Sequence, residues 1–125
     1  MDDDPVNLRF PVELDGALLH IRGLAERRHG FIVSRRITRR AMRKVDATSD
    51  VLWQVIESLE ALDYLDGPLA DHHCADREVW VFRPVVGGQR MYLKVAFRRV
   101  PDGPESALVI WSFHQPRFPM KDPSC

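Results

Sequence analysis

Three segments in the second half of the chain are rich in β-branched and aromatic residues, which is the composition of β-strands. They run from Val79 to Pro84, from Arg90 to Arg98 and from Leu108 to His114. Successive side chains of a strand point to opposite faces. In the middle segment we therefore expect Met91, Leu93, Val95 and Phe97 on one face and Arg90, Tyr92, Lys94 and Arg98 on the other. In the last segment we expect Val109, Trp111 and Phe113 opposite Ser112 and His114.

Helical patterns precede the strands. Apolar residues spaced three and four apart predict a helix over about Asp15 to Glu26, and a second helix that starts near Thr38. A third helix is expected after the N-cap cluster Thr48-Ser49-Asp50. Phe31-Ile32-Val33 predicts either a short strand or an anchor for a linker.

The connections between these elements favour an α+β fold, in which N-terminal helices pack on a C-terminal antiparallel sheet. Asp66-Gly67-Pro68 is expected to break the helical pattern, and residues 70–77 predict a polar loop. Gly87-Gly88 predicts a hairpin turn, and residues 101–104 are expected to join the second strand to the third.

The length of 125 residues fits a single domain, 1–125. We expect a helical half over about 15–64, a sheet half over about 79–115 and an irregular tail over 116–125. The acidic start Met1–Pro5 has no apolar stretch behind it, and no apolar run reaches membrane length. The sequence therefore predicts a cytoplasmic protein without membrane association, in which Cys74 and Cys125 are free thiols.

Charges are segregated along the chain, although 18 basic side chains balance 18 acidic ones. Eight of the 18 basic residues lie between Arg27 and Lys44 with no acid among them, and nine of the acids lie between Asp46 and Glu78. The basic segment indicates a surface for the nucleic-acid backbone, a surface for an acidic partner protein, or only a solvated helix face.

The polar face of the strands carries the groups that metal-free RNA cleavage needs. A base takes the proton of the ribose 2′-hydroxyl, cations stabilise the charged phosphate, and an acid protonates the departing 5′-oxygen. His114 supplies an imidazole, a side chain that can act as base or acid near neutral pH, and Tyr92 offers a phenol. The side chains expected to bind phosphate are Arg83, Arg90, Lys94 and Arg98. The alternative is that this face is only the wet side of an amphipathic sheet.

We predict no metal site and no cofactor. His72-His73-Cys74 looks like a ligand cluster, but adjacent residues do not converge easily on one ion. No second Cys/His group lies at the spacing of a zinc site.

Three short runs carry a resemblance to a known family. Val81-Phe82-Arg83-Pro84 is followed, after seven residues, by Tyr92-Leu93-Lys94, and the last strand ends in Ser112-Phe113-His114. Upstream, Thr38-Arg39-Arg40-Ala41 and the stretch from Val55 to Tyr64 are compatible with the helical half of the same family. Over about residues 16 to 114 the chain resembles the MqsR-type toxins of bacterial type II toxin–antitoxin systems.

The resemblance implies a RelE-like fold, endoribonuclease activity on mRNA without a metal, and a cognate antitoxin that blocks the activity. An association with the ribosome stays open. Tyr92 matches the family's catalytic tyrosine, and His114 stands where the family has a catalytic lysine. The lysine and glutamine that the family has near Tyr64 and Val79 are replaced. The alternatives are a non-catalytic module of the same fold that binds nucleic acid or an antitoxin, and a small protein-interaction domain.

Overall fold

The computed structural model describes residues 10–33, 36–71, 76–98 and 107–116. The predicted connection at 101–104, the cluster His72-His73-Cys74, Cys125 and the tail beyond Pro116 lie outside the described residues.

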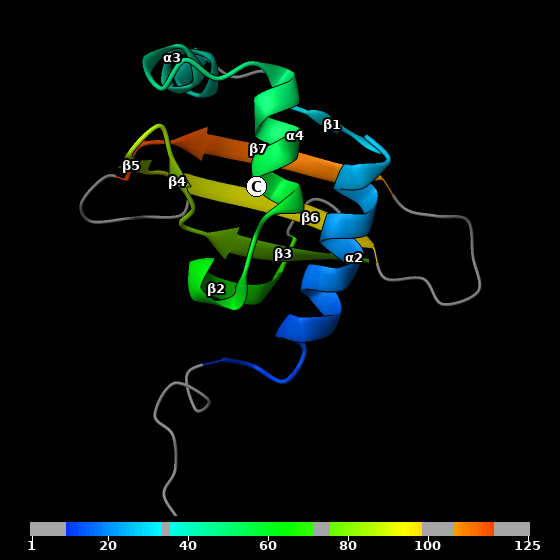
Figure 1. The fold of residues 1–125 in the computed structure, drawn as a ribbon. Coiled ribbons are helices and arrows are strands. Elements are labelled where there is room, and N and C mark those ends of the chain that lie inside the picture. The colour runs from blue at the N-terminus through cyan, green and yellow to red at the C-terminus, as the bar shows by residue number, and fades with distance from the viewer. Residues whose placement is uncertain (1–9, 34–35, 72–75, 99–106, 117–125) are drawn as a thin grey trace, which may run out of the picture.

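Helices and a sheet form the described part of the chain, which confirms the α+β class (Figure 1). The helices are α2 (Leu14–Glu26), α3 (Arg36–Lys44) and α4 (Ser49–Glu57), followed by the short 3₁₀ helix η1 (Ala61–Asp63). All three predicted helices are confirmed. The side chain of Thr48 accepts a hydrogen bond from the backbone N–H of Val51 (3.3 Å), so α4 begins at the predicted N-cap.

Five strands form the main sheet in the order β1 (Gly30–Ile32), β7 (Leu108–His114), β6 (Tyr92–Arg98), β3 (Arg77–Phe82) and β2 (Tyr64–Ala70). β7, β6, β3 and β2 are antiparallel neighbours, whereas β1 runs parallel to β7. The sheet is therefore mixed, and the prediction of a purely antiparallel sheet is wrong at β1. β1 lies between two helices, so no hairpin sets its direction.

The helices cover one face and one edge of this sheet. α2 and α4 lie on one face, and α3 packs against β7 (Figure 1). The backbone N–H of Phe113 donates to the hydroxyl of Thr38 at 3.5 Å. α3 thus follows the edge of β7 beyond the point where β1 ends.

The main core lies between the sheet and the helices. The apolar face of β6 is confirmed, since Met91, Leu93, Val95 and Phe97 all belong to this core. β7 differs from the expected alternation because Lys94 pairs with Ser112 while Val95 pairs with Ile110, so that Trp111 is an extra residue. Such a β-bulge reverses the faces of a strand. Leu108 and Ile110 join Phe113 in the main core, whereas Val109 and Trp111 pack on the opposite side.

β2 contains the segment Asp66-Gly67-Pro68 that we expected to be a break, and it ends at Ala70, where the predicted polar loop begins. Pro68 is tolerated because β2 is an edge strand with two register shifts. Gly67 has a φ of 124°, and a Cβ there would lie 2.8 Å from the carbonyl oxygen of Val79, so this bend requires glycine. The phenol of Tyr64 donates to the carbonyl of Gly67 (2.7 Å). Burial, with Asp66 adding to it, raises the pKa of Tyr64 above its ordinary value, so the phenol remains a donor.

A small hairpin extends one end of the sheet. β4 (Val85–Val86) pairs with β5 (Gln89–Arg90) across Gly87 and Gly88, whose φ angles are 59° and 79°. The predicted turn at these two glycines is confirmed.

Candidate functional site

Tyr92 and His114 meet at the end of the sheet that carries the hairpin. Tyr92 is the first residue of β6 and His114 is the last residue of β7, and the register places them opposite each other. Their rings stack with centroids 4.8 Å apart and planes 15° apart. Strand register decides whether two such residues meet, so only the tertiary structure brings this pair together.

The imidazole of His114 has a defined hydrogen bond. Its Nδ1 lies 2.7 Å from the carbonyl oxygen of Gln115, which only accepts hydrogen bonds. This contact assigns the proton to Nδ1, so the lone pair of the neutral ring lies on Nε2. A histidine in this tautomer has the basic nitrogen that a general base needs. His114 is half-buried, whereas the side chain of Tyr92 is only 5% exposed.

Two exposed arginines lie at the same end of the sheet. The N–H of Met91 donates to the carbonyl of Pro84 (2.8 Å), so the pairing of β3 with β6 continues past Phe82 and places Arg83 opposite Tyr92. The guanidinium of Arg90 donates to the carbonyl of Arg83 (2.9 Å). The structure thus groups Arg83 and Arg90 with the aromatic pair.

Lys94 differs from the other predicted phosphate binders because it is buried. Its side chain is 2% exposed, and its register partner Ser112 is 4% exposed. At Lys94 this face of the sheet is therefore buried, whereas we expected it to be exposed to solvent. A phosphate arriving from solvent does not reach a buried ammonium group, so we leave Lys94 out of the candidate binding set.

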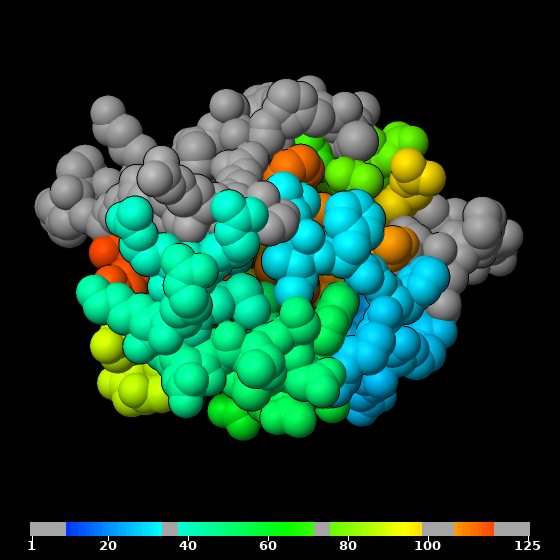
Figure 2. Space-filling model, turned by 90° about the horizontal axis from the view of Figure 1, so that it is seen from above, coloured from blue at the N-terminus to red at the C-terminus, as the bar shows by residue number. Residues whose placement is uncertain are grey.

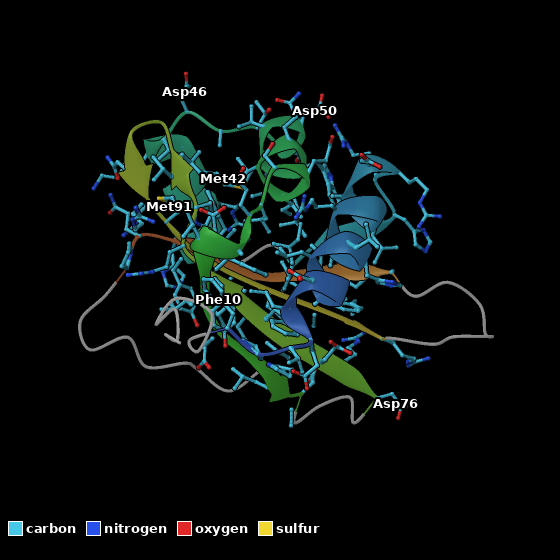
Figure 3. The ribbon with its side chains drawn as sticks, turned by 60° about the horizontal axis from the view of Figure 1, so that its bottom comes forward. Phe10, Met42, Asp46, Asp50, Asp76 and Met91 are labelled. Atoms are coloured by element: carbon cyan, nitrogen blue, oxygen red, sulfur yellow. The ribbon has the colours of Figure 1, made fainter. Side chains whose placement is uncertain are left out.

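Arg98 lies at the opposite end of β6, where it pairs with Arg77. It is six residues from Tyr92, which corresponds to about 20 Å along a strand. Figure 3 allows this separation to be followed, since Met91 precedes Tyr92 at one end of the sheet and Asp76 precedes Arg77 at the other. The structure does not bring Arg98 to the Tyr92–His114 pair.

Side chains that the sequence did not single out connect this end of the sheet to α3. The ammonium of Lys44 donates to the side-chain oxygen of Gln115 at 3.4 Å. The amide of Gln115 in turn donates to the side-chain oxygen of Gln89 at 2.5 Å. The end of the basic segment at Lys44 thus lies beside the strand ends. No local sequence signal indicates this, because the contacts join residues more than 20 positions apart.

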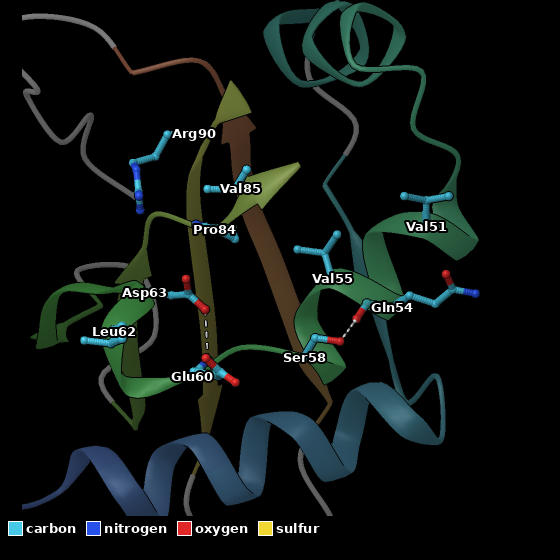
Figure 4. Close-up of a pocket in the computed structure, with 10 residues that line it drawn as sticks. All are labelled: Val51, Gln54, Val55, Ser58, Glu60, Leu62, Asp63, Pro84, Val85 and Arg90. Carbon is cyan, nitrogen blue, oxygen red and sulfur yellow. Dashed lines mark hydrogen bonds between the residues drawn. The ribbon is translucent and has the colours of Figure 1, made fainter. Parts of the chain in front are cut away.

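A groove of about 550 Å³ lies next to the hairpin, between α4 and η1 (Figure 4). Its lining is Val51, Gln54, Val55, Ser58, Glu60, Leu62, Asp63, Pro84, Val85 and Arg90. The carboxylate of Asp63 accepts the backbone N–H of Glu60 (2.9 Å) and so belongs to the cap of η1. The sequence did not predict this groove, because its walls come from several separate elements.

Among the described residues, no group of three or more His, Cys, Asp or Glu side chains has the arrangement of a metal site. No helix in the same part of the chain is long and apolar enough to span a bilayer.

Comparisons with models of protein families, with curated proteins and with solved structures found no match for this chain. The resemblance to MqsR-type toxins and the RelE-like fold therefore stay predictions, based on the residues quoted above.

Proposed function

We propose that this protein is the toxin of a type II toxin–antitoxin pair, with a RelE-like fold, and that it is a metal-independent endoribonuclease that cleaves mRNA. The observation that carries the proposal is the stacked Tyr92–His114 pair, with Arg83 and Arg90 at the same end of the sheet. An imidazole, a phenol and two guanidinium groups are the chemical equipment for this reaction. The partners are mRNA and a cognate antitoxin.

The reaction follows from the groups at the pair. His114 Nε2 accepts the proton of a ribose 2′-hydroxyl, and the 2′-oxygen attacks the adjacent phosphorus. Arg83 and Arg90 stabilise the negative charge that develops on the phosphate. The bond to the 5′-oxygen breaks as the phenol of Tyr92 protonates that oxygen. The products are a 2′,3′-cyclic phosphate and a 5′-hydroxyl, and proton exchange with water restores both side chains.

The first prediction concerns His114→Ala. We expect this variant to cleave RNA at least about a hundredfold more slowly than the wild type, because removing a general base typically costs that much. The measurement is cleavage of total bacterial RNA by the purified protein in the presence of a metal chelator, with new 5′ ends mapped and tested for a free hydroxyl. Tyr92→Phe keeps the ring stack but loses the acidic proton, so we expect a similar loss.

The matched control is His29→Ala, which removes a half-buried histidine at the turn before β1. It should cleave as the wild type does. Wild-type activity in both His114→Ala and Tyr92→Phe would contradict the site assignment, and a wild type that leaves RNA intact would contradict the enzyme itself.

One observation favours a second candidate function, a non-catalytic module that binds nucleic acid or an antitoxin. Tyr92 is only 5% exposed, so the phenol is less accessible than a proton donor for a large substrate usually is. This candidate predicts that the wild type binds an RNA oligonucleotide without cleaving it. It also predicts that a small protein encoded by the neighbouring reading frame forms a complex with it.

A further inference from the structure

The outward side of α3 carries a dense group of cations. Arg39, Arg40, Arg43 and Lys44 are all exposed, and the helix contains no acid. They are spaced three and four apart, so they lie on neighbouring turns. On the inward side, Thr38 and Ala41 are buried against β7.

Nearby acids do not neutralise Arg40 and Arg43, the two members of this group on which the argument rests. Asp50 and Glu57 of α4 both form ion pairs with Arg28, which follows α2, the first at 4.0 Å. Asp46, which follows α3, is exposed and points away from the molecule (Figure 3). Within the part of the chain that the structure describes, the guanidinium groups of Arg40 and Arg43 form no ion pair. Both charges are therefore available to a ligand.

The composition of this surface favours a polyanion over a protein. Protein interfaces have apolar or aromatic anchors at their centre, where charged residues are depleted. The large hydrophobic side chains that are exposed in the described residues are Val12, Leu19, Phe31, Leu62 and Val85, and none of them lies within residues 38–44 of α3. Binding to a phosphate backbone needs only cations.

The position of α3 connects this surface to the candidate site. Figure 2 shows α3, in teal, at the surface beside the start of α4. Lys44, at the end of the helix, contacts Gln115, whose carbonyl oxygen accepts the hydrogen bond from His114. A strand of nucleic acid on α3 would thus lie next to the Tyr92–His114 pair.

We propose that the exposed face of α3 binds the phosphate backbone of a single-stranded nucleic acid and leads the strand to this pair. The second half of the statement rests on the proposed function, whereas the binding does not. A helix of nine residues is about 14 Å long, so it contacts a few successive phosphates. Because phosphate contacts carry no sequence information, RNA and DNA should bind α3 alike.

The test uses single-stranded RNA and DNA oligonucleotides of one sequence, and DNA is not cleaved by this chemistry because it has no 2′-hydroxyl. The variant Arg40→Ala/Arg43→Ala should reduce the slope of log K against log salt by about 1.4, at roughly 0.7 for each lost phosphate contact. If the variant and the wild type bind equally when the data are extrapolated to 1 M salt, this difference in slope makes the variant bind roughly 25-fold more weakly at 0.1 M salt. The factor should be the same for RNA and DNA.

Two controls separate a local site from net charge. Leu19→Glu/Gln54→Glu changes the net charge by the same two units on exposed positions of α2 and α4, and it should keep the wild-type slope. Arg40→Lys/Arg43→Lys keeps the charges and should bind as the wild type does. Equal losses in both charge-changing variants would overturn the proposal, because binding would then follow net charge.

Other outcomes also decide the matter. A wild type that binds neither oligonucleotide at low salt overturns the proposal, and so does one that binds poly-glutamate as tightly, which would assign the surface to an acidic protein. A wild type that binds DNA through α3 but leaves RNA intact refutes the proposed enzyme and supports the binding surface. The experiment can therefore contradict the ribonuclease activity without contradicting the binding surface on α3.

Discussion

Two cationic residues of β6 show that burial determines whether a side chain contributes to packing or is accessible to a ligand. Lys94 and Arg98 lie four residues apart on β6 and share one face, so the sequence pattern treats them alike. In the structure Lys94 is 2% exposed, whereas Arg98 is exposed. A buried long side chain contributes to packing, while an exposed one contributes little to stability.

This contrast gives a prediction about stability. Lys94→Ala should lower the free energy of unfolding by about 2 kcal/mol or more, because it leaves a cavity beneath the sheet face. Arg98→Ala, the matched control on the same strand, should change it by less than about 0.5 kcal/mol. Urea unfolding followed by circular dichroism measures both values. Equal, small effects would mean that Lys94 is accessible and would return it to the phosphate-binding candidates.

At the scale of an element, a local signal sets where α4 begins. Its first turn is satisfied by the hydroxyl of Thr48, and its buried side chains Leu52, Trp53 and Ile56 face the main core. α4 also forms one wall of the groove and packs against α2. The cap therefore contributes both to the position of the groove and to the core.

The cap can be tested directly. Thr48→Ala should lower the free energy of unfolding by about 1 kcal/mol, because one backbone N–H of the first turn loses its acceptor. Thr48→Ser keeps an oxygen at the same place and should retain most of the stability. Thermal unfolding of the three proteins gives the comparison. If Ser and Ala lowered stability to the same extent, the hydroxyl would not be what caps α4.

At the scale of the whole molecule, the sheet has buried residues on both faces. Trp80 is fully buried in the main core, whereas Trp111 packs with Val79, Ala96 and Val109 on the opposite side. The strands β3, β6 and β7 contribute to both clusters. Unfolding of either cluster therefore disrupts β3, β6 and β7, which also carry residues of the other cluster.

Cooperative unfolding is the expected consequence, and it also tests the prediction of one domain. In a variant with Trp111 as its single tryptophan (Trp53→Phe/Trp80→Phe), the fluorescence midpoint in urea should coincide with the midpoint from circular dichroism. The same should hold with Trp80 as the single tryptophan (Trp53→Phe/Trp111→Phe). A lower midpoint from Trp111 alone would show that the second cluster unfolds separately.

Local periodicity and capping were enough to determine much of the chain from the sequence. The three helices, the strands β3, β6 and β7, the turn at Gly87-Gly88 and the apolar face of β6 all follow from side-chain spacing within short segments. Each of these features depends on residues that are close in sequence, so the physical cause is present in the segment itself.

The tertiary structure decided what depends on segments far apart. It pairs β1 parallel to β7, makes β2 an edge strand despite Pro68, and places the bulge at Trp111. The same contacts bury Lys94, separate Arg98 from the other candidates and stack Tyr92 on His114. Strand register and burial are properties of the packed sheet, and a one-residue shift would exchange its faces. The sequence therefore determined which side chains are candidates, and the packing of the sheet decided which of them meet.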